Sequence, residues 1–128
     1  ARPERVTTIL NGIDHRRFQR DPARSPGIRQ ALGYEPHQIV IGAVGRAEPQ
    51  KRFDLLIDAF ASLAPAWPQL RLLIVGDGSQ REPLLTQVAR LGLGERVALA
   101  GHRTDIPDLH HAMDLFVQSS DYEGTPNA

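Results

Sequence analysis

Residues 39–60 have the sequence IVIGAVGRAEPQKRFDLLIDAF. The run from Ile39 to Val44 is apolar and rich in β-branched residues, which is typical of a strand covered on both faces. Apolar residues then recur at the spacing of one helical face, at Phe53, Leu56, Ile57, Phe60 and Leu63. The sequence therefore predicts a buried strand, a tight turn and an amphipathic helix.

Two glycines, one within this strand and one at its end, precede two cations in the turn. Gly42 and Gly45 have no side chain, so we expect backbone or a ligand to approach closely there. Arg46 and Lys51 follow within the same connection. Ligands of open α/β sheets bind at such loops, beyond the carboxyl ends of the strands. The two cations indicate an anion, with phosphate as the first candidate; the alternative is two solvated surface charges beside a turn.

The rest of the chain repeats the alternation of strand and helix. Further strands are predicted for residues 6–10, 70–75, 97–100 and 114–117. Ser25 and Pro26 open a short helix that Gly33 ends, whereas residues 14–25 have the composition of a loop. The alternation predicts an α/β fold, a Rossmann-like open parallel sheet with right-handed crossovers and helices on both faces.

Helix limits are predicted from capping residues and prolines. Pro65 and Pro68 end the first amphipathic helix, and Ser79 with Glu82 resembles a capping box for the next one. The apolar face of that next helix comprises Leu84, Leu85, Val88 and Leu91, and Gly92 and Gly94 follow it. Asp105 is a candidate N-cap of a short helix through about Met113.

Length and composition narrow the class of protein. The 128 residues suffice for one domain with a core, and the formal net charge of zero argues against nonspecific nucleic-acid binding. The chain has no cysteine and no apolar run near the about 20 residues of a membrane span. Its polar start carries no signal peptide, and because residue 1 is not methionine we expect the chain to begin inside a longer protein. We expect a cytoplasmic location, with the inner face of the membrane as an alternative for the parent protein.

Several familiar site motifs are missing from the sequence. No Gly-x-Gly-x-x-Gly follows a predicted strand, and there is no P-loop and no Gly-x-Ser-x-Gly elbow. Of the five histidines only His110 and His111 are close, and neighbouring helical residues point about 100° apart. The sequence therefore predicts no metal site.

Four loops follow predicted strands and should meet on one edge of the sheet. They are residues 45–51, 76–78, 101–103 and 119–127. Glu123 in the last loop could accept hydrogen bonds from sugar hydroxyls, the alternative being an exposed loop carboxylate. For Gly76 and Gly78 the alternative is that they simply form a turn. Asp105 fits the N-cap of a helix better than a ligand contact.

Taken in order, five motifs resemble one family. They are Asn11-Gly12-Ile13-Asp14, Gly45-Arg46 with Lys51, Ile74-Val75-Gly76-Asp77-Gly78, Gly101-His102-Arg103-Thr104-Asp105-Ile106 and Glu123-Gly124-Thr125-Pro126-Asn127-Ala128. Together they resemble the C-terminal, donor-binding domain of retaining GT-B glycosyltransferases of group 1, family 4. The resemblance covers nearly the whole chain.

The resemblance implies a nucleotide-sugar donor, such as a UDP-, GDP- or ADP-sugar, and no cofactor or bound metal. It implies that Arg46 and Lys51 hold the donor diphosphate and stabilise its departure, and that Glu123 contacts the donor sugar. Nucleotide or sugar contacts are expected from Gly45, Gly76, His102, Arg103, Gly124, Thr125, Pro126 and Asn127, with backbone preferred over side chain at His102 and Arg103. The acceptor would attack on the face of the leaving group, giving retention.

Two departures from the family pattern concern the ends of the chain. The second glutamate of the family's Glu-x7-Glu motif would fall beyond Ala128, and no helix follows the last predicted strand. By analogy, residues 1–14 are the tail of an N-terminal acceptor domain and the crossing from it, and residues 15–128 are a partial donor-binding domain lacking its last helices. We therefore expect the 128 residues alone to be inactive.

The sequence is compatible with three hypotheses about the function. The first is the donor-binding half of a hexosyltransferase that acts on an acceptor hydroxyl. The second is a related GT-B enzyme, such as a sugar-nucleotide epimerase or a phosphorylase-like protein. The third is a non-enzymatic α/β binding module, which would bind no nucleotide. The sequence names neither the sugar, the base, the acceptor nor the oligomeric state.

Overall fold

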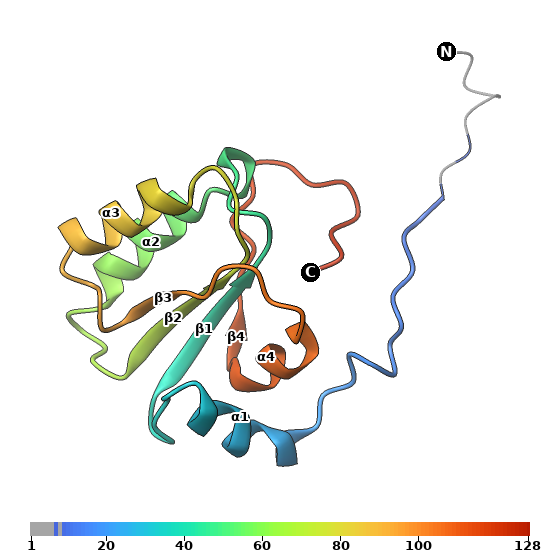
Figure 1. Ribbon diagram of the computed structural model, residues 1–128, viewed down its shortest axis with the longest axis horizontal. Coiled ribbons are helices and arrows are strands. Elements are labelled where there is room, and N and C mark those ends of the chain that lie inside the picture. Colours follow the sequence, from blue (N-terminus) through green and yellow to red (C-terminus); the bar gives the residue numbers. More distant parts are fainter. Residues whose placement is uncertain (1–6, 8) are drawn as a thin grey trace.

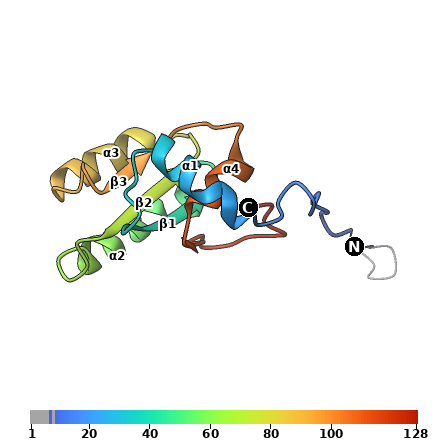
Figure 2. The same ribbon diagram turned by 90° about the horizontal axis from the view of Figure 1, so that it is seen from below.

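The computed structural model describes residue 7 and residues 9–128. The strand predicted for residues 6–10 lies partly outside the described residues, and Thr7, Ile9 and Leu10 belong to no strand. Residues 9–20 contain no helix or strand, turn at residues 15–18, and lie to one side of the sheet and its helices (Figure 2).

A four-stranded parallel sheet forms the centre of the fold (Figure 1). It contains β1 (Ile39–Val44), β2 (Leu70–Val75), β3 (Val97–Leu99) and β4 (Leu115–Phe116), in the order β3-β2-β1-β4. All three strand pairs are parallel, which confirms the predicted α/β fold. The carboxyl ends of the strands therefore share one edge of the sheet.

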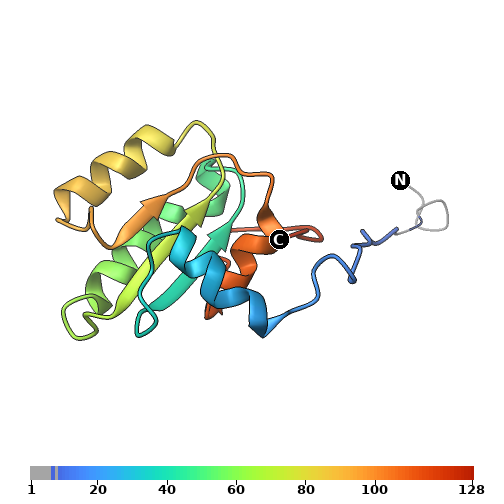
Figure 3. The ribbon, with the colours of Figure 1, turned by 60° about the horizontal axis from the view of Figure 1, so that its bottom comes forward.

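Helices cover both faces of the sheet, as predicted (Figure 3). They are α1 (Ser25–Ala31), α2 (Phe53–Leu63), α3 (Arg81–Arg90) and α4 (Ile106–Ala112), with 3-10 turns η2 (Pro22–Arg24) and η3 (Pro49–Lys51). The buried residues of α2 and α3 pack in one core cluster, and Leu109 of α4 packs in another with Leu32 and Tyr34, which follow α1.

Alternation along β2 divides the core into two layers. Leu72 and Ile74 belong to the cluster under α2 and α3, whereas Leu73 and Val75 belong to the cluster under α4. Successive residues of a strand point to opposite faces, so a strand with both faces covered is apolar throughout. The largely apolar runs of β1 and β2, in which Arg71 is the one charged residue, are therefore correctly predicted as buried strands.

The side chains predicted as N-caps do not cap their helices, whereas Gly33 and Gly92 follow the ends of α1 and α3 with positive φ, as predicted. Gln80, not Ser79, precedes α3, and no side chain caps that helix, because the Ser79 hydroxyl donates to Glu48 Oε2 at 2.7 Å instead. Ser25 lies inside α1 rather than before it. The preceding turn η2, predicted as loop, leads straight into the helix, and Asp21 caps η2 by accepting from the backbone N–H of Ala23 at 3.0 Å.

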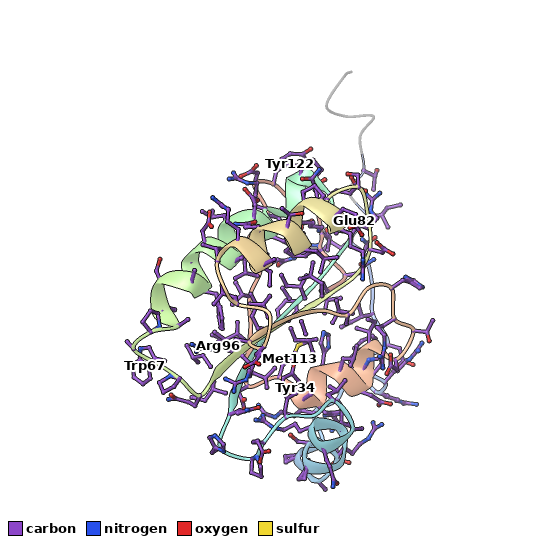
Figure 4. The ribbon with its side chains drawn as sticks, turned by 60° about the vertical axis from the view of Figure 1, so that its left-hand side comes forward. Tyr34, Trp67, Glu82, Arg96, Met113 and Tyr122 are labelled. Carbon is purple, nitrogen blue, oxygen red and sulfur yellow. The ribbon has the colours of Figure 1, made fainter. Side chains whose placement is uncertain are left out.

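The last members of two predicted apolar stripes lie at the surface. Leu63, the last residue of α2, is 47% exposed, and Leu91, which follows the last residue of α3, is 36% exposed. Beyond the end of α2, the guanidinium of Arg96 donates to two backbone carbonyls, those of Ala64 (2.7 Å) and Trp67 (2.6 Å). Arg96 and Trp67 lie at the same end of the molecule (Figure 4). Arg96 thereby satisfies carbonyls that the end of a helix leaves unpaired.

Gly42, in the middle of β1, accommodates a neighbouring side chain. A Cβ built on Gly42 would lie 2.0 Å from the sulfur of Met113, a separation that no real contact allows. Met113 follows α4 and is buried in the core cluster under that helix. The close approach predicted at Gly42 therefore serves internal packing rather than a ligand.

We expect Gly42→Ala to destabilise the protein by about 1–3 kcal/mol, because the added methyl group overpacks the core against Met113. Gly27→Ala is the matched control, since Gly27 lies in α1 and nothing stands within 4 Å of its built Cβ. Alanine should stabilise that helix by about 0.5–1 kcal/mol. Equal unfolding free energies of the two variants in urea would contradict this account.

Candidate functional site

The loops after β1, β2 and β3 meet at the carboxyl edge of the sheet. The Gly45 N–H donates to the Val75 carbonyl at 2.9 Å, and the Gly76 N–H donates to the Gly101 carbonyl at 2.8 Å. The Ala47 N–H also donates to the Asp77 carbonyl, at 2.9 Å. These backbone hydrogen bonds hold the three loops together without using their side chains.

Gly76 makes this convergence possible. Its φ of 135° is one that side-chain-bearing residues rarely adopt, and its built Cβ would lie 1.8 Å from the Gly45 carbonyl oxygen. Gly76 is therefore required for two loops to touch, and is more than a turn former.

Two adjoining hollows lie along this edge and share Val44, Gly45, Arg46 and Ile106. The first has a volume of about 350 Å³ and is also lined by Val75, Gly76, Asp77, His102 and Arg103. The second has a volume of about 530 Å³ and is also lined by Phe18, Gln50, Lys51, Glu123, Thr125, Pro126, Asn127 and Ala128. Of the predicted site residues, only Gly124 lines neither hollow.

Lys51 and Glu123 form an ion pair inside the second hollow. Both side chains are mostly buried, at 18% and 21% exposed, and the Ser120 hydroxyl donates to the same carboxylate oxygen at 2.6 Å. Because Lys51 is already neutralised by Glu123, an anion that binds here must compete with that carboxylate.

The hydrogen bond from Lys51, and after it the one from Ser120, lowers the pKa of Glu123 below its ordinary value of 4.5. A carboxyl whose pKa falls on folding stabilises the folded state above its unfolded pKa. This contribution of Glu123 is therefore present above about pH 4.5 and is lost as the pH falls through its lower folded-state pKa.

Arg46 differs from Lys51 in having no partner. Its side chain is exposed in the wall shared by the two hollows, and it makes no hydrogen bond or ion pair with the part of the chain that the structure describes. Arg46 is therefore the cation that can meet an incoming anion first.

Arg103 is committed to a neighbour rather than to the hollow it lines. Its guanidinium donates to both carboxylate oxygens of Asp105, at 2.8 and 2.6 Å. This pair lowers the pKa of Asp105 and raises that of Arg103. Asp105 precedes α4 as predicted but does not cap it, because its carboxylate binds Arg103. The arrangement leaves the backbone of residues 102–103 as the more accessible recognition element.

Phe18 is a site residue that the sequence did not reveal. It lines the second hollow, and its ring centroid lies 6.0 Å from that of His110. His110 also contacts Phe116 edge-on, and burial lowers the pKa of the His110 imidazole, which favours its neutral form. Phe18 belongs to a polar segment with no periodicity, so no signal marked it.

The N-terminal segment also contacts the site. The Asn11 side-chain amide donates to the Thr125 carbonyl and to Asn127 Oδ1, both at 3.2 Å. These bonds join a segment predicted to be an interdomain crossing to the loop predicted to face the donor sugar.

A larger hollow, about 780 Å³, lies beside α1 at the opposite edge of the sheet. Its buried cation, Arg29, is fully engaged: it donates to Asp114 (2.8 Å) and to the carbonyls of Ala112 (3.2 Å) and Gln38. Asp114 in turn accepts from the Val40 N–H at 2.7 Å. These bonds connect α1 to the sheet, so the polar groups of this hollow serve the fold.

Within residue 7 and residues 9–128, no three His, Asp or Glu side chains are placed to hold a metal ion. None of the helices in that part of the chain has the length and apolar character needed to cross a bilayer.

Comparison with known proteins identifies the family. Residues 25–128 match the family described as Glycosyl transferases group 1. The chain belongs to the group 1 glycosyltransferases. The predicted resemblance to this family is thereby confirmed.

Two curated relatives are clearly similar in sequence. The lipopolysaccharide core biosynthesis mannosyltransferase LpsB of Rhizobium meliloti (strain 1021) is 36% identical over 123 residues, covering 92% of this chain and 35% of that protein. The mannosylfructose-phosphate synthase of Agrobacterium fabrum is 40% identical over 120 residues, covering 86% of this chain and 26% of that protein.

Solved glycosyltransferase structures share the fold. HepE of Anabaena, in complex with UDP and glucose, superposes with a TM-score of 0.83 at 35% identity, covering 93% of this chain and 33% of that one. WaaG, a glycosyltransferase involved in lipopolysaccharide biosynthesis, superposes with a TM-score of 0.82 at 27% identity, covering 94% and 33%. The chain thus spans between 26% and 35% of the length of these four proteins.

We expect Lys51→Met to raise the pKa of Glu123 and Ser120→Ala to raise it by less, because each removes a donor that favours the ionised carboxylate. A pH titration of the Glu123 side-chain carboxyl carbon by NMR measures both shifts. Ser62→Ala is the control, since that hydroxyl donates only to the Asp58 carbonyl in α2. A wild-type Glu123 that titrates at its ordinary value would refute the ion pair.

Proposed function

We propose that the protein is a retaining hexosyltransferase whose nucleotide-sugar donor binds along the carboxyl edge of this sheet. The observation that carries the proposal is the second hollow, where Arg46, Lys51 and Glu123 come together from two segments far apart in sequence. Membership of the group 1 glycosyltransferases supports it, as does the UDP found in the HepE structure.

In the proposed complex the two cations hold the donor diphosphate. Arg46 approaches with a planar fork of donors suited to phosphate oxygens, and Lys51 provides a point charge. During transfer the bond from the sugar to the diphosphate breaks and negative charge grows on the leaving group. Cations fixed in a partly buried site stabilise that charge. The acceptor hydroxyl oxygen bonds to the anomeric carbon from the same face and gives its proton to the departing diphosphate, which retains the anomeric configuration.

Diphosphate binding also releases Glu123. When phosphate oxygens replace the carboxylate on Lys51, Glu123 becomes available to accept hydrogen bonds from donor sugar hydroxyls. Ser120 keeps one oxygen of this carboxylate in place at 2.6 Å. The backbone around Thr125, Pro126 and Asn127 forms the adjacent wall.

The first hollow is proposed to receive the nucleoside. It adjoins the diphosphate site through Gly45 and Arg46, and Val44, Val75 and Ile106 give its wall an apolar part. Because Arg103 is bound to Asp105, base recognition is assigned to the backbone of residues 102–103.

The acceptor is proposed to bind on a second domain. Residues 1–14 are assigned to the tail of that domain and the crossing from it, and the contact of Asn11 with the 125–127 loop supports the crossing. On this proposal the 128 residues alone bind a donor weakly at most and do not transfer sugar.

Calorimetry with UDP, GDP and ADP on the complete protein tests the proposal. We expect one nucleotide to bind, and Arg46→Ala and Lys51→Ala each to weaken it by about tenfold or more, because a charge-assisted phosphate contact contributes about 1.5–3 kcal/mol.

Arg90→Ala, in the last turn of α3, removes the same charge outside both hollows and should leave binding unchanged. A non-enzymatic module would bind none of the nucleotides. Full turnover in Arg46→Ala would contradict the proposed diphosphate site.

A further inference from the structure

The segment that carries Glu123 belongs to no helix or strand. Residues 118–128 follow β4 as an irregular loop, and Tyr122 in its middle is 69% exposed (Figure 4). Glu123 is nevertheless mostly buried against Lys51. Contacts other than packing must therefore fix the loop.

These contacts concentrate on the short turn before α2. The Ser119 hydroxyl donates to the Lys51 carbonyl at 2.7 Å, and the Asp121 N–H donates to the Gln50 carbonyl at 3.0 Å. The Gln50 side chain donates back to the Tyr122 carbonyl at 3.0 Å. Loop and turn thus run side by side around Lys51.

A second ion pair joins the same two segments. Arg52 Nη1 lies 3.0 Å from Asp121 Oδ1, with the side chains 35% and 53% exposed. Arg52 follows Lys51 directly, and Asp121 precedes Glu123 by two positions. Neither Arg52 nor Asp121 lines the hollows at this edge, so the pair lies behind the site rather than in it.

The backbone of Arg52 is unusual. With φ 50° and ψ 40° it is left-handed, and it is the one non-glycine residue with positive φ among the described residues. Such conformations persist where surrounding contacts determine them, and they gather at functional sites. The conformation aims the guanidinium at two carboxylates at once, Asp121 and Asp54.

We propose that Arg52 and Asp121 are positioning residues whose ion pair fixes Glu123 relative to Lys51, and thereby sets the affinity for the sugar part of the donor. The proposal rests on the proposed function, in which Lys51 holds diphosphate and Glu123 holds sugar. Weakening the pair should let the loop drift and misplace Glu123, while Arg46 and Lys51 keep their places.

Asp121→Asn tests the proposal against a closely matched control, Asp54→Asn. Both carboxylates are 53% exposed, both bind the guanidinium of Arg52, and both changes remove one charge. Only Asp121 belongs to the loop of Glu123. Asp54 lies in the first turn of α2, and its carboxylate makes no bond to residues 118–128.

The measured quantity is the ratio of affinities for a nucleotide-sugar and its nucleoside diphosphate, in the complete protein. The probes are UDP-glucose with UDP and GDP-mannose with GDP. For the two ligands that the wild type binds, we expect Asp121→Asn to lower the affinity for the nucleotide-sugar by about threefold to fivefold. This is the size of effect expected from losing an exposed ion pair. Binding of the bare diphosphate should stay within about twofold, and Asp54→Asn should change neither.

Several outcomes would overturn the proposal. If Asp121 had a merely structural role, Asp121→Asn would lower the affinity for both ligands equally. If Asp121 had no role, Asp121→Asn would behave like Asp54→Asn. If the wild type bound neither ligand pair, the proposed function would fail first and the positioning role with it. Wild-type binding with an unchanged ratio in Asp121→Asn would remove only the positioning role.

Arg52→Asn provides a second, independent variant. Asparagine adopts the left-handed conformation more readily than most residues, so the turn can form without the guanidinium. Its affinity ratio should match that of Asp121→Asn, and the double variant should show no further change, because the two residues act as one pair. Additive losses in the double variant would show that they act separately.

Ionic strength distinguishes the ion pair from a steric effect. Salt screens exposed charges, so in the wild type the preference for the sugar-bearing ligand should shrink as salt rises. In Asp121→Asn that preference should already be low and insensitive to salt. A wild-type preference that salt leaves unchanged would argue against the pair.

Discussion

The parallel hydrogen bonding of β1 with β2 is the constraint on which the rest of the structure depends. The two strands pair over their whole length, from Ile39 with Leu70 to Val44 with Val75, so they end at the same level. Their following loops then meet at once, and Gly76 lets them touch at the Gly45 carbonyl. With any other register, Arg46 would not stand beside the Gly76 loop in one wall.

Most cations on this edge are already paired with carboxylates, so a bound anion must compete with those carboxylates. Lys51 is already satisfied by Glu123, and Arg103 by Asp105, whereas Arg46 has no ionic partner in the part of the chain that the structure describes. A ligand therefore gains from Lys51 only what exceeds the contact it displaces. Such exchange favours a ligand that offers both a strong anion for Lys51 and hydroxyl groups for the released carboxylate.

The sequence predicts the strands, the main helices and the grouping of site residues on one edge, because burial on both faces leaves nearly continuous apolar runs such as Leu70–Val75, in which Arg71 is the one polar residue. The predicted N-caps at Ser79 and Asp105 were wrong because each side chain bonds to another side chain instead. Ser79 donates to Glu48, which lies 31 positions earlier in the sequence, and Asp105 accepts from Arg103 in the preceding loop. The Lys51–Glu123 pair could not be foreseen either. Two charges far apart in sequence reveal their contact only once the register of four strands is known.

Gly42 has a consequence for how this domain can change over evolution. The sulfur of Met113 occupies the space where a Cβ at position 42 would stand, so the two positions share one volume. A side chain at 42 requires the Met113 side chain to move or to become smaller. One of these positions lies in the strand that leads to Arg46, and the other follows the helix after the His102–Arg103 loop. Substitutions at the two positions should therefore be inherited as pairs.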